Sequence, residues 1–126
     1  MSLESVRAFL ADKAPDIVIK ELGGHEMKDF NKWSFADDAP PATLPSPLQA
    51  LWWLKKGGLA LGPEWNKAHE LCQKREGEHA YDLVHALVHW IEGDKTNAAY
   101  WYRRVGGQRA DDINTEWQRI ASELSK

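Results

Sequence analysis

Apolar residues recur with helical spacing along most of the chain from residue 46 onward. Over 79–92 they fill one broad arc of a helical wheel, and over 113–124 they form a single stripe. Glycines separate the runs and mark helix ends, and two of them are followed by proline (Gly62-Pro63) or aspartate (Gly93-Asp94). The pattern predicts an all-α fold, a compact stack of five or six short helices. Short corners favour antiparallel neighbours.

The first third of the chain departs from this pattern. A helix is predicted over 2–13, and the β-branched run at 17–19 favours a short extended segment. Four prolines between Pro40 and Pro47 exclude helix interior there and favour extended chain. Because 126 residues is a single-domain length, we expect one domain. It would comprise an N-terminal helix with the extended run (1–22), a Pro-rich connection (23–45) and a helical core (46–126).

Composition narrows the class of protein. The formal net charge of −3 gives no general attraction to nucleic acid or to an anionic membrane, so neither is expected as a partner. The single cysteine, Cys72, allows no internal disulfide and is predicted to be a buried small hydrophobe. The N-terminus has no basic start followed by an apolar run, so no signal peptide is predicted. A soluble cytoplasmic protein is the expectation.

Tryptophan is unusually abundant, with seven residues in the chain. Filling a small core is one use of such large rings, and a surplus at the surface would mark an interface. The helix predicted over 47–56, with Ser46 as its cap, is apolar on nearly all sides and carries Trp52 and Trp53. These two residues are the candidates for contact with a protein partner or with a second copy in a homodimer.

One polar stripe interrupts the apolar arc of the helix at 79–92. His85 and His89 lie one turn apart on it, and Asp82 and Glu92 extend it. Two histidines at this spacing are a known way to hold a divalent metal, and His69 on the preceding helix would join them if the two helices pack antiparallel. The metal candidates are therefore His69, His85 and His89, with zinc, nickel or iron as the ion. The sequence does not firmly imply any cofactor.

The same residues have plainer interpretations. A histidine between two helices often only satisfies a buried carbonyl or carboxylate. A polar pocket that binds a small ligand without metal is a third interpretation; its residues would be His69, His85, His89, Glu92 and Arg103. Arg103 also belongs to a small basic group with Arg104 and Arg109, which could stack a nucleotide base or simply pair with nearby acids.

Two stretches resemble known families. MSLESVRAFLADKAPDIVIKEL, residues 1–22, resembles the start of YbaK-like prolyl-tRNA editing domains, where a first helix leads into a first strand; no editing-site residue falls within it. Four segments within 48–106 resemble a group of small bacterial and fungal helical proteins for which no activity is implied. These segments are LQALWW, EWNKAHELCQ, VHALVHWIEGD and NAAYWYRR. The pair of predicted helices over 79–105 is also similar to a tetratricopeptide or Sel1-like unit, which implies a stack of helical hairpins.

Two functions follow as expectations. The first is a small non-enzymatic helical module that binds a ligand or a protein. The alternative is a histidine-rich, metal-dependent or histidine-based hydrolase that uses His69, His85, His89 and Glu92. The sequence leaves open whether the protein is an enzyme.

Overall fold

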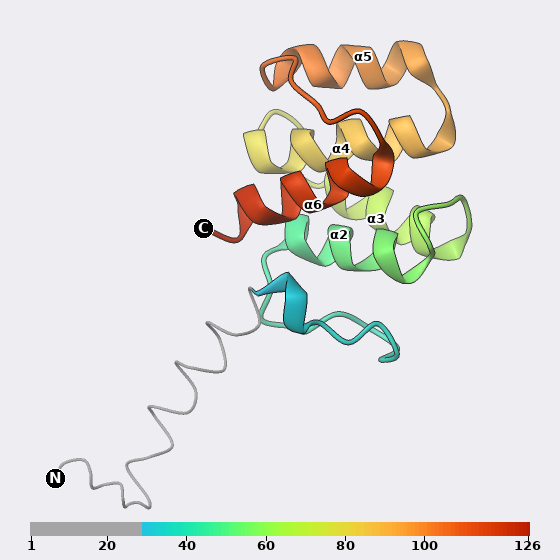
Figure 1. The fold of residues 1–126 in the computed structure, drawn as a ribbon, viewed down its shortest axis with the longest axis vertical. Coiled ribbons are helices and arrows are strands. Elements are labelled where there is room, and N and C mark those ends of the chain that lie inside the picture. Colours follow the sequence, from blue (N-terminus) through green and yellow to red (C-terminus); the bar gives the residue numbers. More distant parts are fainter. Residues whose placement is uncertain (1–28) are drawn as a thin grey trace, which may run out of the picture. The chain divides into compact units, whose positions relative to one another are not determined.

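The computed structural model describes residues 29–126 (Figure 1). The chain divides into two compact units, Met1–Lys32 and Trp33–Lys126. In the described part of the first unit, Asp29 precedes a single 3-10 turn, η1 (Phe30–Lys32), and its carboxylate accepts a 3.1 Å hydrogen bond from the Asn31 amide. The helix expected over 2–13 and the extended run expected at 17–19 lie outside the described residues.

The second unit is a bundle of five α-helices without strands, so the predicted all-α fold is confirmed for residues 33–126. α4 packs against each of the other four helices and is the centre of the bundle (Figure 1). Consecutive helices from α2 to α5 pack against each other, and α6 returns to contact α4 and α2. The helices are α2 (Ser46–Lys56), α3 (Pro63–Gln73), α4 (His79–Glu92), α5 (Lys95–Arg104) and α6 (Ile113–Leu124).

The helix ends show which residues form the turns between helices. Gly93 ends α4 in the left-handed region at φ 86°, and the Asp94 carboxylate then caps α5 by accepting from the Asn97 amide at 3.1 Å. The start of α2 differs from expectation. Ser46 was predicted to cap this helix, but it is the first helical residue, and Pro45 occupies the cap position without a side-chain hydrogen bond. None of the helices in the described part is long and apolar enough to cross a membrane.

The tryptophans fill the core, and none of the seven is exposed. Trp52, expected at an interface, is fully buried and its indole donates to the Ser34 carbonyl at 3.2 Å. It is a core residue because its ring packs against Phe35, with centroids 5.7 Å apart. Trp53 is half-buried, and the Lys67 ammonium lies 4.8 Å from its ring centroid. Of the pair, only Trp53 retains surface that a partner could contact.

Candidate metal centre

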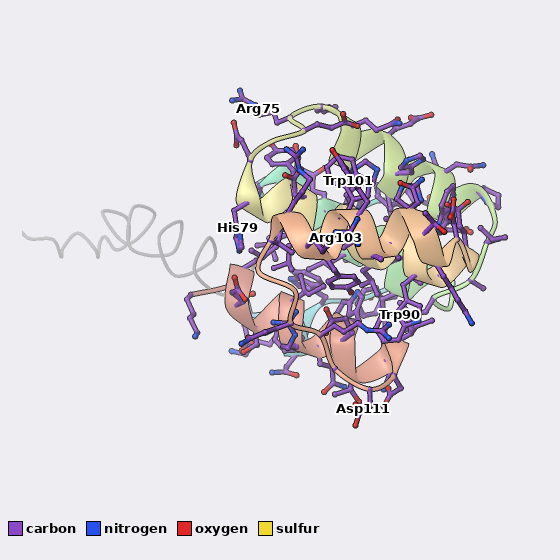
Figure 2. The ribbon with its side chains drawn as sticks, turned by 90° about the horizontal axis from the view of Figure 1, so that it is seen from above. Arg75, His79, Trp90, Trp101, Arg103 and Asp111 are labelled. Carbon is purple, nitrogen blue, oxygen red and sulfur yellow. The ribbon has the colours of Figure 1, made fainter. Side chains whose placement is uncertain are left out.

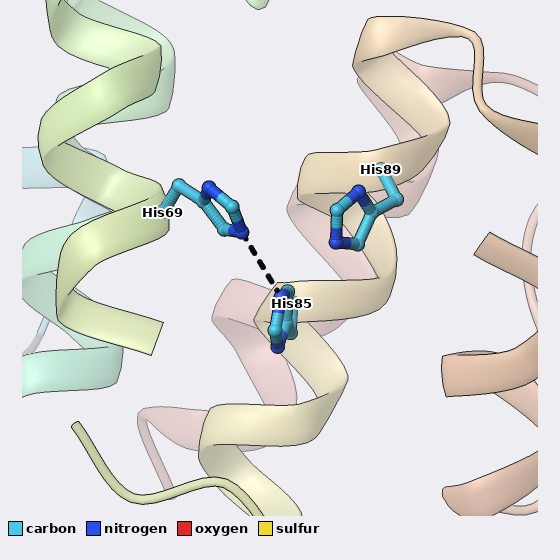
Figure 3. A group of neighbouring side chains, drawn as sticks. All are labelled: His69, His85 and His89. Atoms are coloured by element: carbon cyan, nitrogen blue, oxygen red, sulfur yellow. Dashed lines mark hydrogen bonds between the residues drawn. The ribbon is translucent and has the colours of Figure 1, made fainter. Parts of the chain in front are cut away.

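Three histidines from two helices meet at one point of the bundle (Figure 3). His69 projects from α3, and His85 and His89 project from α4. The Nε2 atoms of His69 and His85 lie 3.2 Å apart, and one ligand nitrogen from each of the three rings lies within 4.8 Å of the other two. His85 and His89 are buried, whereas His69 is partly exposed. We call these three residues the histidine group.

Two tryptophans hold the histidine group in place. Trp65, one turn before His69 on α3, donates its indole N–H to the Val88 carbonyl of α4 at 2.9 Å. This bond fixes the two helices so that His69 faces α4. From the other side Trp101 of α5 stacks on His85, with ring centroids 4.2 Å apart and planes 24° apart. Three helices therefore build the site, although only two supply its nitrogens.

Burial keeps part of the group uncharged. Removal from water and, after it, the nearby His89 and His69 together lower the pKa of His85 from its usual 6.5 to about 4. The pKa of His69 is also lowered, first by burial and then by His89, with Glu92 opposing the shift. At neutral pH these two imidazoles are therefore neutral, which is the form that can bind a metal ion.

A carboxylate orients the third ring. Nδ1 of His89 is hydrogen-bonded to the carboxylate of Glu92, which lies one turn along α4. When Nδ1 carries the proton and donates to Glu92, Nε2 of His89 has a free lone pair. Metal-binding histidines commonly donate their second nitrogen to a carboxylate in this way. Glu92 thus acts on His89, and is not a free base beside the group.

The hydrogen-bonding capacity of the group is incompletely used. Nδ1 of His85 is buried and has no hydrogen-bond partner within the described part of the chain. Buried polar atoms in folded proteins nearly always form a hydrogen bond, so a buried atom without one needs a specific explanation. This nitrogen is not the Nε2 atom that faces His69, so a ligand bound through Nε2 would leave it unpaired as well.

Two residues expected near the histidines lie elsewhere. Asp82 accepts from the Gly77 amide at 3.0 Å and lies 3.6 Å from the Arg104 guanidinium, so it anchors the turn before α4 instead of extending the site. Arg103, expected in the polar pocket, lines a separate cavity beside Trp90. The reason is helical geometry, because Arg103 lies two positions after Trp101 and therefore on nearly the opposite side of α5.

The structure also shows the surroundings of Cys72 and of the carboxylates near His89. Cys72 is buried, and burial raises the pKa of its thiol, so it behaves as the predicted small hydrophobe and not as a nucleophile. Glu92 could also join His89 and Asp94 in a second group of potential metal ligands. That second group is weaker, because the Asp94 carboxylate already caps α5 and both carboxylates are reached by solvent.

The sequence interpretation missed a second buried polar cluster. Glu116 of α6 is fully buried and accepts from the Tyr102 hydroxyl at 2.8 Å and from the Ala110 amide at 2.7 Å. Arg119 donates Nε to one of its oxygens and a terminal nitrogen to the other, both at 2.8 Å. Only the i, i+3 spacing of Glu116 and Arg119 was visible in the sequence, and such pairs are usually exposed.

Comparisons with protein-family models, with curated protein sequences and with solved structures gave no match to this chain. The resemblances drawn from the sequence, including the tetratricopeptide-like arrangement, therefore stay expectations. What is known of the site comes from its own geometry: a group of three histidines that could hold a metal ion.

Proposed function

We propose that this small helical protein binds a divalent transition metal, zinc in the first place, through His69, His85 and His89. One observation carries the proposal: three imidazoles, two of them buried, bring a nitrogen each to within 4.8 Å of the others. In a tetrahedral zinc site with Zn–N bonds of roughly 2.0–2.1 Å, neighbouring nitrogens are about 3.3 Å apart. The 3.2 Å separation of His69 and His85 already matches that distance.

Only His89 would have to move closer. It stacks beside His85, with ring centroids 4.8 Å apart, and its backbone is fixed in α4. Its ring nitrogen lies within 4.8 Å of the others and would have to come up to about 1.5 Å closer to reach that spacing, a shift that rotation of the side chain can supply. Glu92 supports the same assignment because its hydrogen bond to Nδ1 directs Nε2 of His89 toward the ion.

Three protein ligands leave one tetrahedral position for water or a small ligand. Sites closed by four protein ligands are structural, whereas an open position lets zinc polarise a bound molecule. His69 is partly exposed, so solvent reaches this side of the group. That exposure favours a second candidate function, a zinc-dependent hydrolase. Zinc held by the three histidines would supply activated water as the nucleophile, and Glu92 would not be available as the general base because it is engaged with His89.

Zinc titration of the unfolding transition tests the proposal. A metal that binds only the folded chain stabilises it by about 2.7 kcal/mol when its free concentration is 100 times the dissociation constant. We expect this increase in the free energy of unfolding for the wild-type protein and its loss in His85→Ala. Nickel and ferrous iron, tested in the same way, identify the preferred ion. Glu92→Gln should weaken zinc binding about 10- to 100-fold.

His79→Ala is the matched control, since His79 also belongs to α4 but its side chain is 58% exposed and pairs with Glu123 (Figure 2). This variant should keep the full response to zinc. An unchanged unfolding free energy of the wild-type protein with all three metals would contradict the proposal. So would an equal loss of the response in His79→Ala and His85→Ala, because that result would indicate surface binding.

A further inference from the structure

A second cavity lies on the far side of α5 from the histidine group. Its volume is about 410 Å³, within the range of roughly 300–1,000 Å³ that is typical of small-molecule sites. The rings of Trp90 and Tyr102 and the methyl group of Ala98 give it an apolar wall. Trp90 and Arg103, which border it from α4 and α5, are labelled in Figure 2.

The polar part of the lining is positively charged. Lys95, Arg103 and Arg109 line the cavity, and no carboxylate does. Within residues 29–126, none of these three side chains forms an ion pair with an aspartate or glutamate. This is unusual for a chain whose net charge is −3. Three uncompensated cations around one cavity favour an anion.

The fold brings these cations to the aromatic wall. Gly106 and Gly107 end α5 with φ of 109° and 80°, a conformation that favours glycine, and the Gly107 amide donates to the Tyr102 carbonyl at 2.7 Å. The chain then turns back, and the Arg109 guanidinium lies 4.2 Å from the centroid of the Trp90 ring. Arginine stacked on an indole keeps its remaining N–H donors available for an oxyanion.

The Tyr102 hydroxyl cannot serve a ligand here. It is buried against Glu116, to which it donates at 2.8 Å. The tyrosine therefore presents only its ring to the cavity, and the charged donors that line the site are the three cationic side chains. An apolar aromatic wall beside unpaired guanidinium groups is suited to a flat ring that carries a negative charge.

We infer that this cavity binds a small planar aromatic anion, with its ring against Trp90 and Tyr102 and its carboxylate or phosphate held by Arg103 and Arg109, assisted by Lys95. A nucleoside monophosphate and an aromatic carboxylate share this chemistry. The inference is independent of the proposed metal function, because the histidine group and this cavity share no residue.

Isothermal titration calorimetry of the full chain tests the inference with four probes: adenosine monophosphate, 1-naphthoate, adenosine and inorganic phosphate. We expect at least one of the two aromatic anions to bind with a dissociation constant below about 1 mM, and the uncharged nucleoside and the ringless anion to bind at least tenfold more weakly. Whichever aromatic anion binds more tightly identifies the source of the anionic group.

Arg103→Gln and Arg109→Gln should each weaken the binding about tenfold, because each removes a charged donor. Arg75→Gln is the matched control, since Arg75 is an exposed arginine that does not line the cavity (Figure 2). His85→Ala should leave the affinity unchanged, which separates this site from the metal proposal. The inference is overturned if neither aromatic anion binds at about 5 mM, if adenosine binds as tightly as its monophosphate, or if Arg75→Gln weakens binding equally.

Discussion

Two clusters of buried polar side chains lie in the same small bundle, and they differ in how fully their hydrogen-bonding groups are used. The carboxylate of Glu116 receives four hydrogen bonds, from Tyr102, Ala110 and twice from Arg119. Its charge is balanced by the guanidinium. In the histidine group one imidazole pair shares a single hydrogen bond, and a buried nitrogen of His85 has no partner among the described residues.

The difference separates a structural cluster from a candidate binding site. A buried charge with all its partners in place stabilises one arrangement of the chain, since losing any partner leaves an unpaired group in the core. Glu116 in this way ties α6 to the end of α5 and to the segment between them. A group of buried neutral imidazoles joined by a single hydrogen bond makes a weaker contribution to folding and can exchange that bond for a ligand. The histidine group fits this second description.

The largest expected effect is therefore on the Glu116 cluster. Glu116→Ala should lower the free energy of unfolding by about 3–5 kcal/mol, because it leaves Arg119 and the Tyr102 hydroxyl without their acceptor. Glu116→Gln keeps the shape of the side chain, so it should lower the free energy of unfolding by less. This variant can be measured even if the alanine variant does not fold. Urea denaturation followed by circular dichroism measures both.

Glu123→Ala provides the comparison for that experiment. Glu123 is on the same helix and interacts with Arg119 at 3.8 Å, but its side chain is 41% exposed. Exposed ion pairs contribute little to stability, so Glu123→Ala should change the free energy of unfolding by less than about 0.5 kcal/mol. Equal effects of Glu116→Ala and Glu123→Ala would mean that burial does not distinguish the Glu116 cluster.

The next effect is a dependence of stability on pH in metal-free protein. The pKa of His85 is about 4 in the folded chain and 6.5 as its ordinary value. Between these values the unfolded chain binds more protons, so stability is full above pH 6.5 and falls as the pH is lowered toward 4. The slope for one proton is at most about 1.4 kcal/mol per pH unit, which gives a loss of about 2 kcal/mol between pH 7 and 5.

His85→Phe keeps a ring against Trp101 and removes the titrating group. In the presence of a chelator, its loss of stability between pH 7 and 5 should be smaller than that of the wild-type protein, since His85 no longer contributes. Thermal unfolding at a series of pH values measures this. A variant as sensitive to pH as the wild-type chain would show that His85 does not shift in the folded protein as described.

Within the histidine group, the smallest effect on stability is expected for His69 in the absence of metal. His69→Ala removes one hydrogen bond to His85 from a partly exposed position, so the loss of unfolding free energy should be about 1 kcal/mol or less. The same substitution should abolish the stabilisation by zinc. A large loss without metal would place the histidine group with the Glu116 cluster, as a structural network. Chemical denaturation with and without zinc distinguishes the two results.

Local patterns predicted the features that depend on neighbours in the sequence. The 3.6-residue spacing of apolar side chains located the five helices, and Gly93-Asp94 marked the corner between α4 and α5. The i, i+4 spacing placed His85 and His89 on one face of α4. Because α3 and α4 are joined by a short connection, His69 could be expected nearby, and the structure brings the three together.

Features that depend on contacts between distant parts of the chain could not be predicted from local patterns. Trp52 is core because Ser34 and Phe35 contact it. Arg103 and Asp82 have the right residue types for the site but face other elements. Glu116 looks like an ordinary surface glutamate of an amphipathic helix until Tyr102 and the Ala110 amide are brought to it. Each case depends on which helix faces which, and a single sequence does not specify this.

The most direct test of the central claim is the position of zinc in a crystal of the full chain grown with one equivalent of the metal. The account predicts one anomalous difference peak bound by nitrogens of His69, His85 and His89 at about 2.0–2.1 Å, with Glu92 still hydrogen-bonded to His89. A peak bound instead by Glu92 and Asp94, or no zinc in the group while the hydrogen bond between His69 and His85 persists, would contradict it.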